Sequence, residues 1–116
     1  MDTSAEYVKM CDCPEIQGQR GLHGDRWNVL AWHEPNLEAH GISDHPPLAL
    51  TGHEVWLPRQ DQLQEMVGGS WVGQLTELWH GTTTDYWAQF KSWEQAWLAF
   101  VMHEKHNKHW NGEEWV

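Results

Sequence analysis

The strongest pattern of apolar and polar positions lies in residues 92–116. Ser92 and Gln95 match the capping box, in which the hydroxyl accepts a first-turn N–H and the glutamine reaches back to the cap. Five apolar residues then recur at helical spacing and predict one buried stripe: Trp93, Ala96, Trp97, Phe100 and Val101. This stripe is the longest in the chain, so we expect it to supply much of the core, with both of its tryptophans serving a structural role.

A turn signal follows this helix. Asn111-Gly112 is typical of a type I′ turn, because both residues tolerate the positive φ that the turn requires. Trp110 and Trp115 flank the pair and are predicted to meet across a small hairpin. Since an isolated hairpin is marginally stable, we expect it to pack on another element, most simply the helix before it.

The beginning of the chain predicts a short helix. Thr3 and Glu6 match a second capping box, and apolar residues recur as far as about Cys11. Pro14 ends this helix, because the residue before a proline is driven out of the α region. Residues 14–17 are predicted to add one more turn, and the glycines that follow predict irregular structure as far as residue 25.

Two segments in the first half of the chain predict strands. Residues 26–33 carry apolar side chains on both faces, which indicates a central strand or one covered on both sides. Residues 53–57 predict a second strand that pairs antiparallel with the first. The intervening residues 34–47 hold three prolines with several acids and histidines and show no periodicity. We therefore expect a mobile or functional loop over about residues 34–50.

Residues 58–67 predict a further helix. Its proline suits the first turn, where the missing N–H costs nothing, and Gly68-Gly69 end it. Less regular sequence follows, in which we expect a short helix over residues 74–80. Residues 82–90 predict a polar linker anchored by Trp87 and Phe90.

Together these elements predict one α+β domain spanning residues 1–116. We expect a small antiparallel sheet of two to three strands, about three helices packed on one of its faces, and the C-terminal hairpin. Composition alone argues against a folded chain, because only 21 of 116 residues are Leu, Ile, Val or Phe and the net charge is −10. Ten tryptophans compensate, since each can bury about 150–250 Å².

The charge balance limits the classes of partner. With 17 acidic and 7 basic residues, direct binding to nucleic-acid phosphates is disfavoured, whereas a basic protein is a suitable partner. The simpler interpretation is that this charge only keeps a tryptophan-rich chain in solution. We find neither an apolar run of about 20 residues nor a leader, so we expect a cytoplasmic protein that does not enter membranes. Two close cysteines agree with a reducing compartment.

Histidines provide the first candidate site. His103, His106 and His109 recur every three residues and drift across one side of the last predicted helix. Three imidazoles can hold Zn²⁺ or Ni²⁺, although the same residues also suit a solvated helix end that favours positive charge. Cys11 and Cys13 form no second pair of metal ligands, and Cys11 is better interpreted as a small buried apolar residue.

Tryptophans provide the second candidate site. Most of the ten are expected in the core, but Trp71, Trp79 and Trp87 lie outside the secure periodic segments. They are the candidates for a partly exposed patch that anchors a protein interface or stacks on sugar rings or bases. The sequence contains none of the familiar catalytic motifs, so we predict a protein that is not an enzyme.

Three segments together carry a resemblance. CDCPEIQ, EVWLPRQDQLQEM and the last 25 residues resemble small proteins of unknown function from bacteriophages and prophages. The shared pattern is a Pro-Glu-Ile-Gln start, a WLP-x-Q-x-QL helix opening and a W-x-G-x-x-W turn. The resemblance implies a phage-related origin and brings no catalytic residues with it.

These observations lead to one preferred function and two alternatives. We expect a non-catalytic phage or prophage accessory protein that binds another protein through a tryptophan-anchored interface with an acidic rim. One version competes with DNA for the basic groove of a host protein. The alternatives are a metal-binding domain that uses histidines, and a module that stacks exposed tryptophan on glycans or bases.

Overall fold

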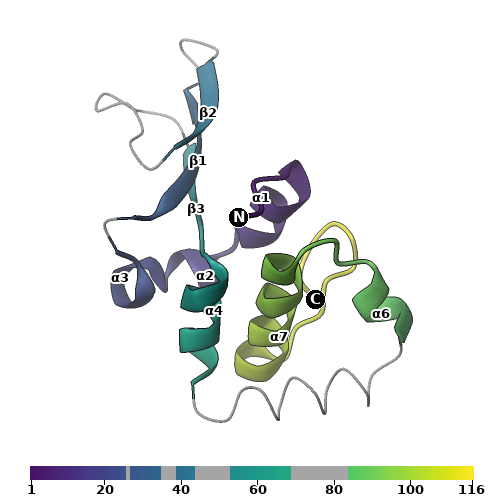
Figure 1. Ribbon diagram of the computed structural model, residues 1–116. Helices are drawn as coiled ribbons and strands as arrows, with labels where there is room; N and C mark the ends of the chain where they lie inside the picture. The colour runs from purple at the N-terminus through teal and green to yellow at the C-terminus, as the bar shows by residue number, and fades with distance from the viewer. Residues whose placement is uncertain (26, 35–38, 44–52, 69–83) are drawn as a thin grey trace.

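The computed structural model describes residues 1–25, 27–34, 39–43, 53–68 and 84–116. Helices and a three-stranded antiparallel sheet confirm the predicted α+β class (Figure 1). In chain order the elements are α1 (Ala5–Cys11), α2 (Pro14–Gln17), α3 (Arg20–His23), β1 (Val29–Glu34), β2 (Ala39–Ser43), β3 (His53–Leu57), α4 (Gln60–Val67), α6 (Thr84–Ala88) and α7 (Trp93–His106).

The sheet has the order β2-β1-β3, and both pairings are antiparallel. The predicted pairing of the first and second strands is therefore confirmed, and β1 is the central strand. Leu30 and Ala31 are successive residues that point to opposite faces, and both are buried. This explains why the sequence of β1 is apolar on both faces.

Strand β2 lies within the segment that the sequence predicted to be a loop, so that prediction is wrong for residues 39–43. Gly41 stands opposite Trp32 in the register of the two strands. A Cβ atom at Gly41 would lie only 2.8 Å from the Trp32 ring, so the glycine gives the ring room to lie across β2. The strand has five residues, which is too few to show an alternating pattern around a glycine.

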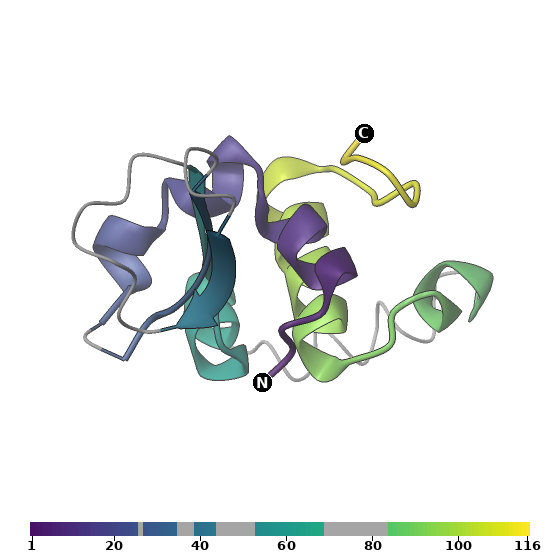
Figure 2. The same ribbon diagram turned by 90° about the horizontal axis from the view of Figure 1, so that it is seen from above.

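Helix α7 lies at the centre of the helical part, where it packs against both α1 and α4, while α1 also contacts β3 (Figures 1 and 2). All residues from Gln95 to Met102 are buried. The apolar surface of α7 is thus wider than the predicted stripe, and the expectation that this segment supplies much of the core is confirmed. The sheet extends away from these helices at its far end (Figure 1).

Helix α1 begins one residue later than the capping pattern predicted. Ser4, and not Thr3, is the N-cap, and its hydroxyl accepts the backbone N–H of Tyr7. The buried Tyr7 hydroxyl donates to the Pro58 carbonyl at 2.6 Å, which joins α1 to the start of α4. Helix α2 is the predicted extra turn, and its Gln17 side-chain amide bonds both the N–H and the carbonyl of Trp56.

Helix α3 stands where the sequence predicted irregular structure. Helix α4 begins at Gln60, two residues after Pro58, because Arg59 is the N-cap and its backbone N–H donates to the Gln62 side chain at 2.8 Å. Gly68 ends α4 as predicted, with a φ of 69°. The short helix expected over residues 74–80 lies outside the described residues.

Helix α6 corrects the prediction of a polar linker over residues 82–90. The predicted anchors nevertheless hold it in place, since Trp87 is 4 % exposed and Phe90 packs against the core. Trp87, Tyr86 and Phe90 contact one another edge to face, with ring centroids 5.2–5.8 Å apart. The segment was predicted as a linker because most of its residues are polar, but it forms a short helix that packs through its aromatic side chains.

The C-terminal hairpin is present, and Trp110 and Trp115 meet across it with ring centroids 5.0 Å apart. Its turn is not the predicted type I′, because Asn111 lacks positive φ. The Asn111 side chain instead accepts the backbone N–H groups of Glu113 and Glu114, each at 2.8 Å. Both indole N–H groups donate to α1, one to Glu6 and one to the Met10 carbonyl, so the hairpin is fixed to α1.

Candidate functional site

The predicted tryptophan site is not where the exposed tryptophans lie. Trp87 is 4 % exposed and belongs to the core, so its assignment to an exposed binding patch is wrong. Trp71 and Trp79 lie outside the described residues. Within the described part of the chain, Trp27 and Trp93 are the large exposed aromatic residues, and each is 61 % exposed. Both had been predicted at buried positions, in a strand and on the helical stripe.

Trp93 occupies the first turn of α7, directly after the N-cap Ser92. It lines two cavities, one of about 620 Å³ that reaches α1 and one of about 270 Å³ beside Phe90. An exposed aromatic side chain beside two hollows is the arrangement in which a tryptophan anchors an interface. The position is fixed because Ser92 accepts the Gln95 backbone N–H at 3.1 Å and so holds the first turn.

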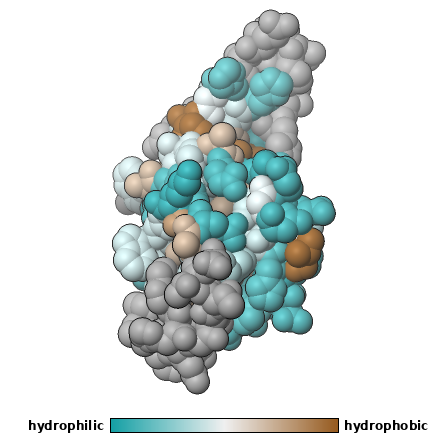
Figure 3. Space-filling model, turned by 90° about the vertical axis from the view of Figure 1, so that its right-hand side faces the viewer, coloured by the Kyte–Doolittle hydropathy of each residue, from teal (hydrophilic) through white to brown (hydrophobic). Residues whose placement is uncertain are grey.

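The larger cavity beside Trp93 is acidic. Asp2, Glu6 and Glu94 line it together with two cationic groups, the Lys91 side chain and the N-terminal ammonium of Met1. We call Trp93 together with Asp2, Glu6, Glu94 and Lys91 the Trp93 surface. The described part of the face seen in Figure 3 is mainly hydrophilic, with hydrophobic residues that stand apart from one another. Trp93 and the carboxylates that line its larger cavity form a local feature at the start of α7.

Asp2 is held at the start of α7 by several hydrogen bonds. Its carboxylate accepts from the Ser92 hydroxyl, from the Gln95 side-chain amide at 2.9 Å and from the Ser4 backbone N–H at 2.9 Å. Partial burial raises the pKa of Asp2, but the hydrogen bonds from Ser92, Ser4 and Gln95 outweigh it and lower the pKa below its usual value. Asp2 is consequently a carboxylate at neutral pH.

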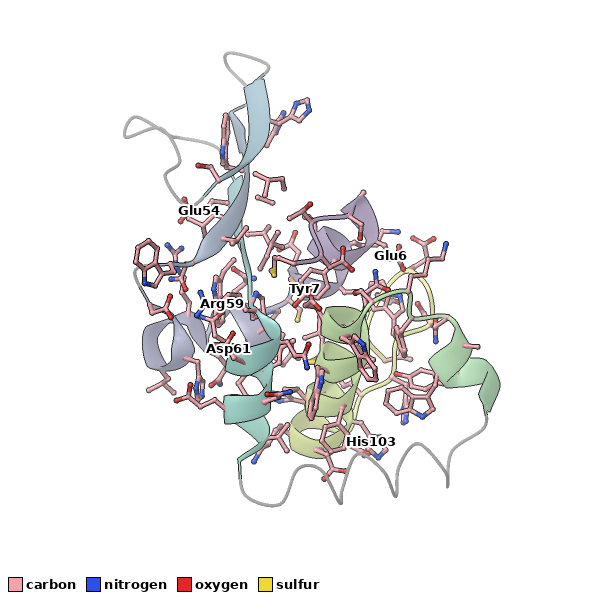
Figure 4. All side chains as sticks on the ribbon, in the orientation of Figure 1. Glu6, Tyr7, Glu54, Arg59, Asp61 and His103 are labelled. Carbon is pink, nitrogen blue, oxygen red and sulfur yellow. The ribbon has the colours of Figure 1, made fainter. Side chains whose placement is uncertain are left out.

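The other two carboxylates are also oriented. The Asp2 backbone N–H donates to Glu94 at 2.7 Å, and the Trp110 indole N–H donates to Glu6 at 3.0 Å. Figure 4 shows Glu6 on α1, beside the C-terminal hairpin. Glu94 also pairs with the N-terminal ammonium of Met1 at 3.7 Å, and both carboxylates retain oxygen lone pairs for a partner. This arrangement fixes negative charge beside an exposed indole ring.

The predicted histidine site is only partly assembled. The His103 Nδ1 and His109 Nε2 atoms are 3.1 Å apart, so two of the three histidines meet. His106 instead lines a separate cavity of about 340 Å³ with Met66 and Val101. The described residues contain no group of three potential metal ligands, so the three-histidine set is not brought together there.

The cysteines have the environment of structural residues. Cys11 is fully buried, as predicted, and burial raises the pKa of its thiol well above the usual value. Cys13 lines a cavity of about 350 Å³ between α2 and the C-terminal hairpin, and burial raises its pKa to about 11. Both thiols are therefore protonated at neutral pH, which disfavours nucleophilic chemistry at either position.

Searches of protein-family models, curated proteins and solved structures find no match to this chain. The resemblance to bacteriophage proteins consequently stays a prediction. Among the described helices, none combines the length and apolar character needed to cross a membrane. The Trp93 surface is therefore the candidate binding site among the described residues, although the sequence pattern had assigned Trp93 to the core.

Proposed function

We propose that the protein is a non-catalytic binding protein whose Trp93 surface takes a basic segment of another protein. The observation that carries this proposal is Trp93 itself, which is 61 % exposed, lines two cavities and lies beside three oriented carboxylates. An arginine- or lysine-containing segment fits this chemistry best. Its cationic group can lie over the indole face while neighbouring basic residues pair with Asp2, Glu6 and Glu94.

The magnitudes favour an interface centred on the aromatic ring. A cation over an indole is worth about 0.5–2 kcal/mol, and a tryptophan anchor at an interface about 2 kcal/mol or more. Exposed ion pairs at the rim add only about 0–1 kcal/mol each. The net charge of −10 contributes mainly to the association rate with a basic partner.

The wider setting of this function follows from the sequence. We propose a cytoplasmic accessory protein of phage or prophage origin, in line with the three resembling segments. Competition with DNA for the basic groove of a host protein is a specific form of the same proposal. It needs the same two properties, a negative surface and an aromatic anchor, and it excludes direct binding of the protein to nucleic acid.

The test is a calorimetric titration of the protein with a synthetic arginine-rich peptide of about ten residues, at two salt concentrations. We expect binding that weakens as salt rises, because exposed charge pairs are screened over about 10 Å at 0.1 M salt. Trp93→Ala should weaken binding by about tenfold or more, which corresponds to the loss of about 1.4 kcal/mol. An acidic peptide of equal length is expected not to bind.

Trp27 supplies the matched control, because it is exposed to the same extent as Trp93. Trp27→Ala should leave binding of the basic peptide unchanged, while Glu94→Gln should weaken it and reduce its salt dependence. Equal binding by Trp93→Ala and the wild type, or binding insensitive to salt, would contradict the proposal. Oligonucleotides and oligosaccharides are titrated in parallel, and binding of either at Trp93 in place of the peptide would assign a stacking function instead.

A further inference from the structure

We propose that His103 and His109 form a two-histidine site for a divalent transition-metal ion such as Zn²⁺ or Ni²⁺. This site is separate from the Trp93 surface, because it lies at the opposite end of α7 (Figure 4). Fourteen helical residues place the two ends about 20 Å apart. The site also differs from the three-histidine set predicted from the sequence, because it does not include His106.

The chain reversal after α7 creates the pair. Asn107 adopts the left-handed conformation, with φ 54° and ψ 44°, and its backbone N–H donates to the His103 carbonyl. Asparagine is among the few residues other than glycine that accept this conformation readily. The Lys108 backbone N–H then donates to the Met102 carbonyl at 3.1 Å, and the chain turns back beside the last helical turn.

His109 is held in place by its neighbours. Its backbone pairs with Val116 through two hydrogen bonds of 2.8 and 2.9 Å, which fix it in the C-terminal hairpin. The Tyr86 ring contacts its imidazole edge to face at 5.5 Å, and the Tyr86 hydroxyl accepts the Trp110 backbone N–H. Both the ring and the backbone of His109 are thus positioned before any ion arrives, which lowers the cost of binding.

The distance between the two nitrogens suits a shared ion. Imidazole nitrogens bind Zn²⁺ at about 2.0–2.1 Å, so two of them at a tetrahedral angle lie about 3.3 Å apart. The observed separation is 3.1 Å, with the ring planes inclined at 59°. A widening of a few tenths of an ångström with a small ring rotation admits the ion. His109 is exposed and His103 is half-buried, so water can occupy the remaining coordination positions.

The test uses protein purified without a histidine tag and stripped of metal with a chelator. Titration with Ni²⁺ or Zn²⁺ is followed by calorimetry, and Co²⁺ is followed by its visible absorption. We expect one ion per chain and a melting temperature that rises with ion concentration, because binding to the native state alone stabilises it. His103→Gln and His109→Gln should each weaken binding by about tenfold or more, since one imidazole cannot chelate.

His106→Gln is the matched control, because this histidine lies on the same helical turn but faces another cavity. It should bind each ion within about twofold of the wild type. Equal losses in all three variants would overturn the proposal in favour of unspecific binding by histidines. Failure of the wild type to bind at millimolar ion would also overturn it, and would leave the pair as a hydrogen bond between neutral rings. Melting curves in chelator show whether each variant is folded.

Discussion

Trp93 and Trp97 are one helical turn apart on α7, yet their surroundings are opposite. Trp97 is 2 % exposed and contacts Phe100 edge to face at 5.8 Å, whereas Trp93 is 61 % exposed beside two cavities. The same residue type at the same spacing therefore serves the core in one turn and the surface in the turn before it.

The difference arises from what covers α7. Helices α1 and α4 pack on α7, whose residues from Gln95 to Met102 are buried, while its first turn meets residues before α1. Those residues contact it through polar groups, namely Asp2 with Ser92 and Gln95. A periodic stripe thus reports which face of a helix is apolar, and the neighbouring elements decide how far along the helix that face is covered.

The largest expected effect is in the covered turn. Trp97→Ala should lower the free energy of unfolding by about 3–5 kcal/mol, because it leaves a cavity among buried residues. Denaturant unfolding followed by circular dichroism measures the change. A decrease in the free energy of unfolding of less than about 1 kcal/mol would contradict the assignment of Trp97 to the core and of Trp93 to the surface.

The cap between the two regions should have an intermediate effect. Ser92→Ala removes the acceptor for the Gln95 backbone N–H and the donor to Asp2, and should cost about 1 kcal/mol. Ser92→Thr keeps the hydroxyl and serves as the control in the same unfolding measurement. Equal stability of the two variants would show that the hydroxyl does not hold the first turn.

Asp2 should contribute a smaller, pH-dependent effect. Its folded-state pKa is lowered, so its stabilisation is complete above the unfolded pKa and disappears as the pH falls through the folded value. Asp2→Asn should therefore destabilise the protein at neutral pH by about 0.3–1 kcal/mol, as expected for a carboxylate at a helix N-terminus. The variant should also show a shallower loss of stability below about pH 4 than the wild type. Parallel acid dependences in the two proteins would contradict this role.

The smallest stability effect is expected at the exposed tryptophan. Trp93→Ala should change the free energy of unfolding by less than about 0.5 kcal/mol, as is usual for exposed positions. Comparison with Trp97→Ala in one denaturation series tests the contrast directly. A destabilisation similar to that of Trp97→Ala would show that Trp93 contributes to the core and would contradict this prediction.

Much of the fold was predictable because the segments with strong apolar patterns are the ones that form the core of the structure. β1, β3 and α7 have regular apolar patterns, and Pro14 and Gly68 mark ends that the backbone imposes. β2 was missed because Gly41 interrupts its short apolar pattern, and α6 because its turn lies in a segment of mainly polar residues. β3 is equally short but was recognised, because its apolar residues are not interrupted by a glycine.

The candidate site was less predictable, for a different reason. Trp93 is exposed although it shares the helical stripe with buried residues, and no pattern within α7 records which of its turns the other elements cover. Similarly, His103 and His109 meet because the left-handed Asn107 ends the helix between them. A continuous helix would have placed the three histidines along one side of α7. The asparagine directly after the last basic turn indicates this helix end in the sequence.

The Gln17 side chain has one further consequence, for contacts between molecules. β1 occupies one side of β3, so the N–H and carbonyl of Trp56 that face Gln17 belong to the outer edge of the three described strands. Such an edge is a template for strand addition by another chain, and thus a route to aggregation. By bonding both groups, a single glutamine amide supplies the rung that a fourth strand would otherwise form, and it closes this part of the edge to other copies of the protein.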